Sequence, residues 1–132
     1  MILAYDAPFA TSVAMRDFQH FYIAWAGNGV RVAATADGGA TWTQSLAFSG
    51  AADIPSLAID ANGNLGVAAN ELSSNSGILF ARSTSAGARW TASTVFSNSS
   101  RLYTVDANLA FDSGGKALIV YDQDAVRFTR EQ

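Results

Sequence analysis

The chain has 132 residues, of which 49% are hydrophobic and 14% charged, and its formal net charge is −3. The hydrophobic content can bury a core and excludes wholesale disorder, while the low charge predicts that a partner covers part of the surface. The acidic balance, with no run of basic residues, excludes a nucleic-acid backbone as the main ligand.

The first residues, Met1–Asp6, contain neither the basic region nor the long apolar stretch of a signal peptide. No segment approaches the roughly 20 apolar residues that a membrane-spanning helix needs. The absence of cysteine excludes disulfides and thiolate metal sites. We therefore expect a soluble chain with no membrane partner, cytoplasmic by default.

An internal repeat starts near the N-terminus. Segments Ser12–Trp25, Ser56–Ala69 and Asn108–Tyr121 align without a gap, and each is an apolar strand, a tight polar turn and a second apolar strand. In the second and third copies the turn contains Asn62-Gly63 and Gly114-Gly115, and glycine tolerates the positive φ that such hairpins require. These segments predict hairpins rather than helices.

A second repeated block follows the first hairpin. Residues Thr35–Ser49 match Ser83–Ser97 at a constant spacing, and each block comes after a short apolar run. One unit is therefore four antiparallel strands. Four-stranded units that recur about every 40 to 50 residues, as they do in this chain, are typical of β-propeller blades. We predict an all-β fold built of such blades.

The unit boundaries divide residues 1–132 into three blades of one domain. Two blades are complete, and the third has three strands. Ile2–Tyr5 resembles the fourth strand of the first complete blade, which makes it a candidate closing strand. The segments are a closing strand at 1–6, blades at 12–48 and 56–96, and three strands at 107–130.

Residues 35–42, which we call turn 1, contain the pattern Ser/Thr-x-Asp-x-Gly-x-Thr-Trp. The matching residues are Thr35, Asp37, Gly39, Thr41 and Trp42. A carboxylate can accept backbone N–H groups across a turn, a glycine can adopt a conformation closed to other residues, and a Trp ring can pack on the sheet. Turn 1 resembles the Asp-box, or BNR repeat, of sialidase-like β-propellers.

Residues 83–90, which we call turn 2, are a degenerate copy of turn 1. They retain Ser83, Gly87 and Trp90 but have Ser85 for Asp and Arg89 for Thr. We expect turn 2 to be held less firmly than turn 1. The resemblance implies that both turns are structural and lie on the face away from a functional site.

The resemblance also implies a ring of six blades. Three blades would leave apolar flanks exposed, and two copies of the chain supply six. We therefore predict a homodimer that closes a six-bladed ring. The closing strand of one chain would complete the last blade of its partner.

Functional residues are expected in the loops opposite turns 1 and 2, because rigid strands display such loops. The catalytic candidates are Asp53, Glu71, Tyr103 and Asp106. The candidate ligand-binding residues are Arg101, Tyr103, Asp124 and Trp25. Asp122 is a further polar loop residue, and each of these charges could equally be an ordinary solvated loop charge.

The aromatic and turn residues have structural alternatives. Trp25 and Tyr121 end second strands, where an aromatic ring can stack on a sugar or pack between blades. Asp60 and Asp112 occupy matching positions and are expected to accept turn N–H groups. His20 is expected at the surface. No spacing predicts a metal site, and we expect no cofactor.

Sialidases of the resembling family hold the substrate carboxylate with three arginines, and only Arg101 falls in a candidate loop. The preferred hypothesis is a non-catalytic binding or structural module with a possible carbohydrate ligand at the central pocket. One alternative is a sialidase-like glycoside hydrolase that uses loop carboxylates. Another is a fragment of a larger propeller enzyme.

Overall fold

The computed structural model describes residues 8–72, 77–97, 106–122 and 125–132. These residues form strands and turns, with no helix among them. The strands in chain order are β1 (Phe9–Met15), β2 (Phe21–Gly27), β3 (Gly29–Thr35), β4 (Thr43–Phe48), β5 (Ala52–Ile59), β6 (Leu65–Glu71), β7 (Gly77–Ser83), β8 (Thr91–Ser97), β9 (Ala107–Phe111), β10 (Ala117–Asp122) and β11 (Val126–Arg130). The prediction of an all-β chain is confirmed.

The strands form three antiparallel sheets, one for each repeat of the sequence. Unit 1 is the sheet β1-β2-β3-β4, unit 2 is β5-β6-β7-β8, and unit 3 is β9, β10 and β11 with β10 in the middle. The strand order within each sheet follows the chain, as a meander of consecutive hairpins requires. The closing strand proposed at residues 1–6 lies outside the described residues.

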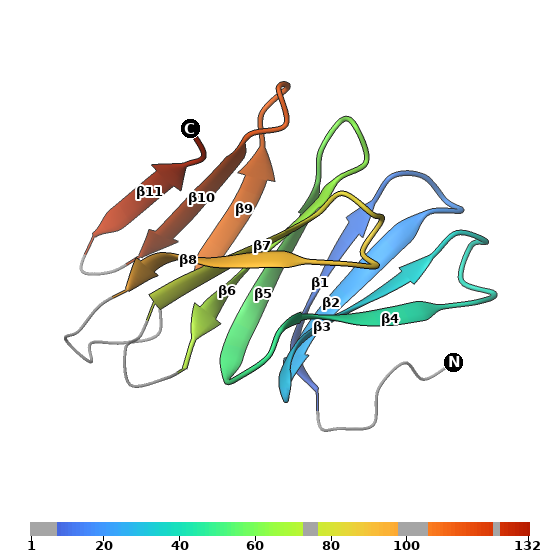
Figure 1. The fold of residues 1–132 in the computed structure, drawn as a ribbon, viewed down its shortest axis with the longest axis horizontal. Helices are drawn as coiled ribbons and strands as arrows, with labels where there is room; N and C mark the ends of the chain where they lie inside the picture. The colour runs from blue at the N-terminus through green and yellow to red at the C-terminus, as the bar shows by residue number, and fades with distance from the viewer. Residues whose placement is uncertain (1–7, 73–76, 98–105, 123–124) are drawn as a thin grey trace.

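The three sheets fan out from their first strands (Figure 1). β1 packs along β5, and β5 packs along β9, whereas the outer strands β4 and β8 barely touch. The first strands run in the same direction, so the turns after β1, β5 and β9 lie at one end of the array. Turns 1 and 2 lie at this same end because neighbouring strands are antiparallel.

The core consists of two apolar layers between the sheets. The layer between units 1 and 2 is made by alternate residues of each sheet, including Tyr22, Val32, Leu57 and Val67. The layer between units 2 and 3 includes Phe80 and other residues of β6, β7, β9 and β10. This alternation places one set of side chains toward the preceding unit and the other toward the following unit.

The first strands begin earlier than the repeat predicted. β1 begins at Phe9 and β5 at Ala52, because each strand continues through a β-bulge before the expected start at Ser12 or Ser56. Asp53 therefore lies within a strand, and the expectation that it belongs to a loop is wrong. Glu71 and Asp122 are likewise the last residues of β6 and β10.

Candidate functional site

The end of the sheets opposite turns 1 and 2 carries a repeated backbone distortion. Ala10 and Ile54 occupy aligned positions in the bulges of β1 and β5, with φ values of 54° and 48°. Positive φ is a true outlier for a β-branched residue such as Ile54. Such strain gathers at functional sites and persists only where the surrounding structure imposes it. Ala86 of turn 2 also has a positive φ, but only at this end does the distortion recur at aligned positions of two units, so we take this end as the candidate site.

The bulge of β5 lies beside two carboxylates. In the register of β5 and β6, Ala52 is opposite Glu71 and Asp53 is opposite Asn70, so the two carboxylates are on neighbouring strands, one position apart. The backbone N–H of Ile54 donates to Asp53 Oδ1 at 2.6 Å. Both carboxylate residues are half-buried. Because successive side chains of a strand alternate between its faces, Asp53 shares a face with Asn70, and Glu71 lies on the other face of the sheet.

Asn70 is a member of this group that the sequence analysis missed. It is 3% exposed, and among the described residues neither its amide nitrogen nor its amide oxygen has a hydrogen-bond partner. An unpaired buried polar group costs about 1–3 kcal/mol, so its presence requires a reason. The repeat contains a signal, because the aligned residue of unit 1 is the apolar Ala26.

Asp106 and Asp122 form a second acidic pair at the same end, in unit 3. The Asp106 N–H donates to Asp122 Oδ1 at 3.2 Å, and both residues are exposed. This bond joins the start of β9 to the end of β10 and gives Asp122 a structural role. The candidates Arg101, Tyr103 and Asp124 lie outside the described residues.

The two candidate stacking aromatics are buried. Trp25 is 5% exposed, and Tyr121 is 8% exposed within the layer between units 2 and 3. The ring of Tyr121 lies 5.3 Å from that of Phe96. The burial of Tyr121 agrees with packing between units, whereas Trp25 is buried but belongs to neither of the two core layers.

Turn 1 has the contacts that its sequence pattern predicted. Asp37 accepts the Thr41 N–H at 2.8 Å and the Thr41 hydroxyl at 2.6 Å, and Thr35 donates its hydroxyl to the same carboxylate. The hydroxyl of Thr41, its N–H and the hydroxyl of Thr35 lower the pKa of Asp37 from 3.8 to about 2. Trp42 donates to the Gly39 carbonyl at 2.9 Å.

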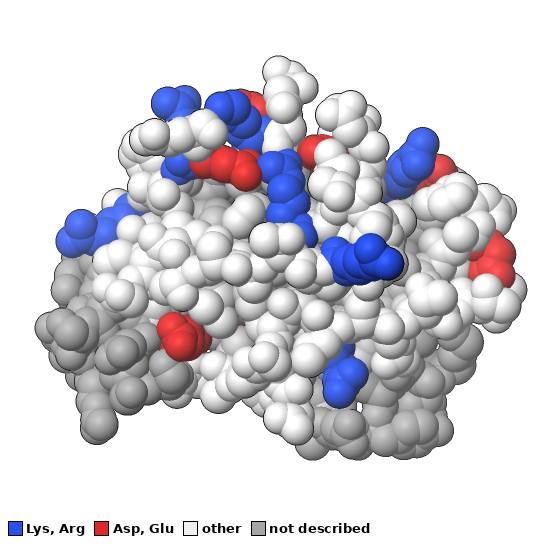
Figure 2. Space-filling view, viewed as in Figure 1, with Lys and Arg blue, Asp and Glu red and all other residues white. Residues whose placement is uncertain are grey.

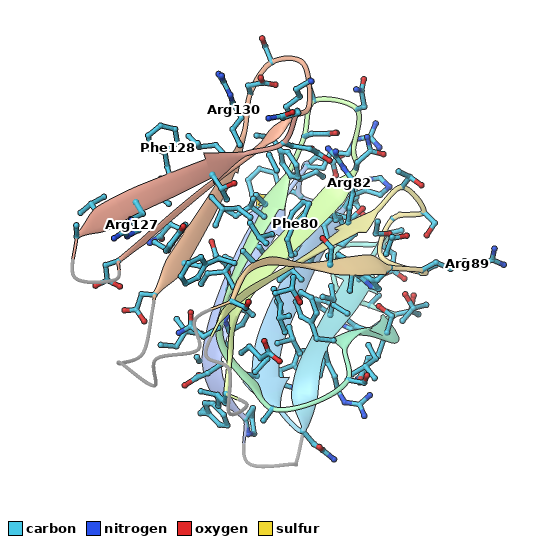
Figure 3. All side chains as sticks on the ribbon, turned by 60° about the vertical axis from the view of Figure 1, so that its left-hand side comes forward. Phe80, Arg82, Arg89, Arg127, Phe128 and Arg130 are labelled. Atoms are coloured by element: carbon cyan, nitrogen blue, oxygen red, sulfur yellow. The ribbon has the colours of Figure 1, made fainter. Side chains whose placement is uncertain are left out.

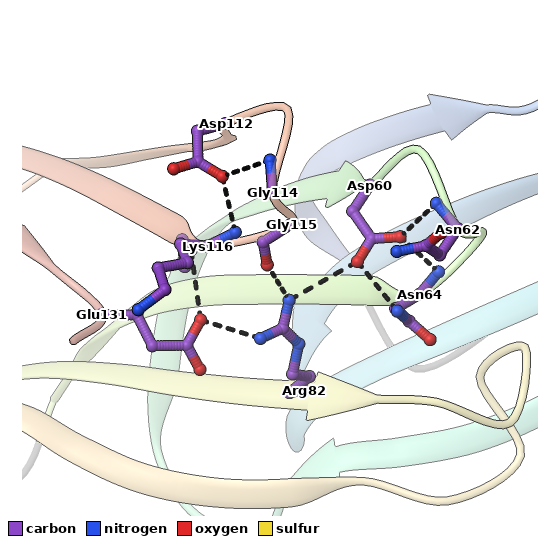
Figure 4. A network of polar contacts seen from close by, with 10 residues as sticks. Asp60, Asn62, Asn64, Arg82, Asp112, Gly114, Gly115, Lys116 and Glu131 are labelled. Carbon is purple, nitrogen blue, oxygen red and sulfur yellow. Dashed lines mark hydrogen bonds and ion pairs between the residues drawn. The ribbon is translucent and has the colours of Figure 1, made fainter.

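The polar residues of the hairpin turns after β5 and β9, at the same end as turn 1, also have structural roles. Asp60 accepts three hydrogen bonds, from the N–H groups of Asn62 and Asn64 and from the Asn64 amide (Figure 4). Asp112 accepts the N–H groups of Gly114 and Lys116. The prediction for both aspartates is confirmed.

Arg82 connects Asp60 to unit 3. It lies 3.5 Å from Asp60, donates to Glu131 at 2.7 Å and also donates to the carbonyl of Gly115. Burial raises the pKa of Asp60, but the bonds from Asn64 and Asn62 and the charge of Arg82 outweigh it, so the pKa is lowered overall. The network in Figure 4 therefore fixes unit 3 on unit 2.

Unit 1 uses a different residue for its first turn. Asp17, one position after the residue aligned with Asp60, accepts the N–H groups of Gln19 and His20. The His20 ring lies 2.8 Å from the same carboxylate and is partly exposed, in agreement with its expected surface position. Hydrogen bonds from His20 lower the pKa of Asp17.

A groove of about 430 Å³ lies between the sheets of units 2 and 3. Phe80, Val95 and Ile119 give it apolar walls, and Arg82 and Glu131 form part of its polar lining. Phe80 points into the space between the two sheets (Figure 3). Most of the charged side chains on the face in Figure 2 lie along the upper rim, at the end with the hairpin turns.

No family model matches the chain, and no curated protein matches it. Within the described ranges, no group of three or more His, Cys, Asp or Glu side chains could hold a metal ion. The same ranges contain no helix that is long and apolar enough to cross a membrane.

Proposed function

We propose that the chain is half of a six-bladed β-propeller of the sialidase-like type, which closes as a homodimer and binds a carbohydrate at the end opposite turns 1 and 2. In this proposal the module is non-catalytic. Two four-stranded units and one three-stranded unit, stacked with adjacent first strands and separated outer strands, support the propeller geometry. The contacts within turn 1 support the Asp-box resemblance.

The observation that carries the binding function is the pair of Asp53 and Asn70 on one face of the sheet beside a strained bulge, with Glu71 next to Asn70 on the other face. Carboxylates accept hydrogen bonds from hydroxyl groups, and an amide both donates and accepts. An acidic group of this kind suits a neutral ligand rich in hydroxyls and repels an anionic sugar. The expected ligand is therefore a neutral glycan rather than a sialylated one.

The alternative activity, a glycoside hydrolase, is favoured by one observation. Asp53 and Glu71 supply two carboxylates at the same end of adjacent strands, on opposite faces of the sheet, and two carboxylates are the minimum machinery for glycoside hydrolysis. The same pair would serve in a larger propeller enzyme of which this chain is a fragment.

A screen against neutral and sialylated glycans tests the proposal. The wild-type chain should bind neutral glycans, and Asp53→Asn and Glu71→Gln should each weaken binding at least several-fold, because each replaces one acceptor oxygen with an NH2 donor and removes the charge. Arg89→Ala is the matched control, because Arg89 is exposed on turn 2 at the opposite end. Binding of no glycan, or equal loss in the control, would contradict the proposal.

An assay with aryl glycosides separates binding from catalysis. We expect no turnover by the wild-type chain. Turnover that disappears in Glu71→Gln would establish the hydrolase alternative instead.

A further inference from the structure

The face that each unit turns toward the preceding unit is covered in units 2 and 3, whereas in unit 1 it is exposed along β1 and buried at Trp25 of β2. Leu57 of unit 2 is 6% exposed, and Leu109, its counterpart in unit 3, packs against the layer between units 2 and 3. The aligned residue of unit 1, Val13, is 62% exposed, and Met15 beside it on the same face is 52% exposed. Unit 1 therefore presents, along β1, apolar side chains of the kind that are covered inside the array.

The opposite face shows the reverse pattern. Val30 of unit 1 and Ile78 of unit 2 face the following unit and are both 0% exposed, whereas the aligned Val126 of unit 3 is 81% exposed. Phe80 is 9% exposed, and its counterpart Phe128 is 73% exposed and projects from the far side of unit 3 (Figure 3). The outer face of unit 3 is thus an uncovered copy of the faces on which units 2 and 3 are packed.

A polar contact repeats across the two internal junctions. The Leu57 N–H donates to Ser12 Oγ at 3.0 Å, and the Leu109 N–H donates to Ser56 Oγ at 3.0 Å. In both cases a first strand offers a side-chain acceptor to the backbone of the next first strand. The next acceptor in this series is Asn108, which is exposed and whose amide oxygen can accept the same bond.

A charged side chain of unit 2 also crosses an internal junction, and it too has a counterpart in unit 3. Arg82 of unit 2 crosses the junction to the Gly115 carbonyl and to Glu131 of unit 3. The residue of unit 3 aligned with Arg82 is Arg130, which lies beside Phe128 at the outer face (Figure 3). Unit 3 thus repeats the polar as well as the apolar part of the internal junction.

From these repeats we infer that the outer face of unit 3 binds the open face of unit 1 of a second copy of this chain, head to tail, and that two such junctions close the pair. The inference rests on the proposed ring and adds its contact residues. The partner is a second copy of the chain because the exposed faces of units 1 and 3 correspond to the two sides of a junction. That junction occurs twice within the chain, between units 1 and 2 and between units 2 and 3. In each new junction Asn108 accepts the Val13 N–H of the other copy. Exposed apolar faces drive association. A head-to-tail interface forms a closed ring when the rotation between successive copies returns to the first copy, here after two copies.

Disulfide trapping tests this contact directly, since the chain contains no cysteine. The double variant Val13→Cys/Asn108→Cys should form a covalent dimer on mild oxidation, and each single variant should not. The pair Ser56→Cys/Leu109→Cys is the matched control, because it occupies the same two positions of the internal junction and should link within one chain. A double variant that stays monomeric while the control links, single variants that link equally well, or covalent chains longer than two would overturn the inference.

If the control pair does not fold, a second measurement tests the contact between units 1 and 3 of two copies. Val13→Asp and Phe128→Asp place a charge on one open face each, and light scattering should show that either variant lowers the mass to that of one chain. If only one of the two substitutions abolished the dimer, the result would contradict the head-to-tail arrangement. The glycan screen measures binding at the candidate site independently of this interface. Failure of the interface and failure of carbohydrate binding are therefore distinguishable.

Discussion

Turns 1 and 2 connect the third and fourth strands of their units with different sequences and nearly the same backbone. In turn 1 the Thr41 N–H is accepted by the Asp37 carboxylate, and in turn 2 the aligned Arg89 N–H is accepted by Ser85 Oγ at 2.9 Å. The Gly39 N–H is accepted by Thr35 Oγ1 in turn 1, and the Gly87 N–H is accepted by Ser83 Oγ in turn 2. A short hydrogen-bond acceptor at the third residue of the turn, Asp37 or Ser85, is therefore sufficient to form this backbone conformation, and a charged side chain is not required for it.

The two turns differ more in what they touch. Trp42 packs edge-on against Phe21 of its own sheet. Trp90 donates to Ser45 Oγ of unit 1 at 2.9 Å, and its ring packs against the core layer between units 1 and 2. Ser45 also donates to the Gly87 carbonyl at 2.5 Å. The degenerate turn is therefore the one that joins two units.

The largest expected effect separates the two tryptophans. Trp90→Ala should lower the free energy of unfolding by about 3 kcal/mol, because it removes a large ring and a hydrogen bond at the junction. Trp42→Ala should cost about 1–2 kcal/mol, because the ring, half-buried like that of Trp90, contacts Phe21 and bonds to Gly39 within its own unit and joins no second unit. Urea denaturation measures both. A larger loss for Trp42→Ala would show that turn 1, not turn 2, is the structural connection.

A smaller effect concerns the backbone. Ala86 of turn 2 has a φ of 51°, where the aligned Gly38 of turn 1 has 71°. This conformation is strained for alanine, so Ala86→Gly should raise the free energy of unfolding by roughly 0.5–1 kcal/mol. Gly38→Ala should lower it by a similar amount, because an added Cβ would meet its nearest atoms at an ordinary 3.5 Å and only the strain remains. Thermal unfolding of the two variants should show shifts of opposite sign.

The smallest effect is a pH dependence specific to turn 1. The pKa of Asp37 is lowered from 3.8 to about 2, so its stabilising contribution is complete above pH 3.8 and is lost as the pH falls toward 2. Asp37→Ser, which copies turn 2, should lower the melting temperature at neutral pH. That difference should shrink between pH 4 and pH 2. A difference independent of pH would show that the carboxylate charge does not stabilise the turn.

The sequence predicted the part of the fold that depends on local pattern. Paired apolar runs around Asn62-Gly63 and the pattern of residues 35–42 specify hairpins through turn chemistry alone, and the structure contains them. The early starts of β1 and β5 were not predictable, because Ala10 and Ile54 adopt positive φ against their intrinsic preference. Sheet context imposes that conformation, and a pattern of residue types does not encode it.

The candidate site was predicted in part. Asp53 and Glu71 were identified by residue type, but their place on neighbouring strands depends on a register that the bulge shifts. Asn70 was missed because an amide within an apolar strand looks like a neutral strand residue until its burial is known. The exposed faces of units 1 and 3 followed from the repeat, since their aligned residues are apolar at each junction.

The central claim is that the three units form an incomplete array whose open faces close on a second copy. The mass of the wild-type chain in solution, measured by light scattering over a range of concentrations, tests it most directly. The account predicts a stable species of twice 13.9 kDa. A well-folded monomer of 13.9 kDa would contradict it.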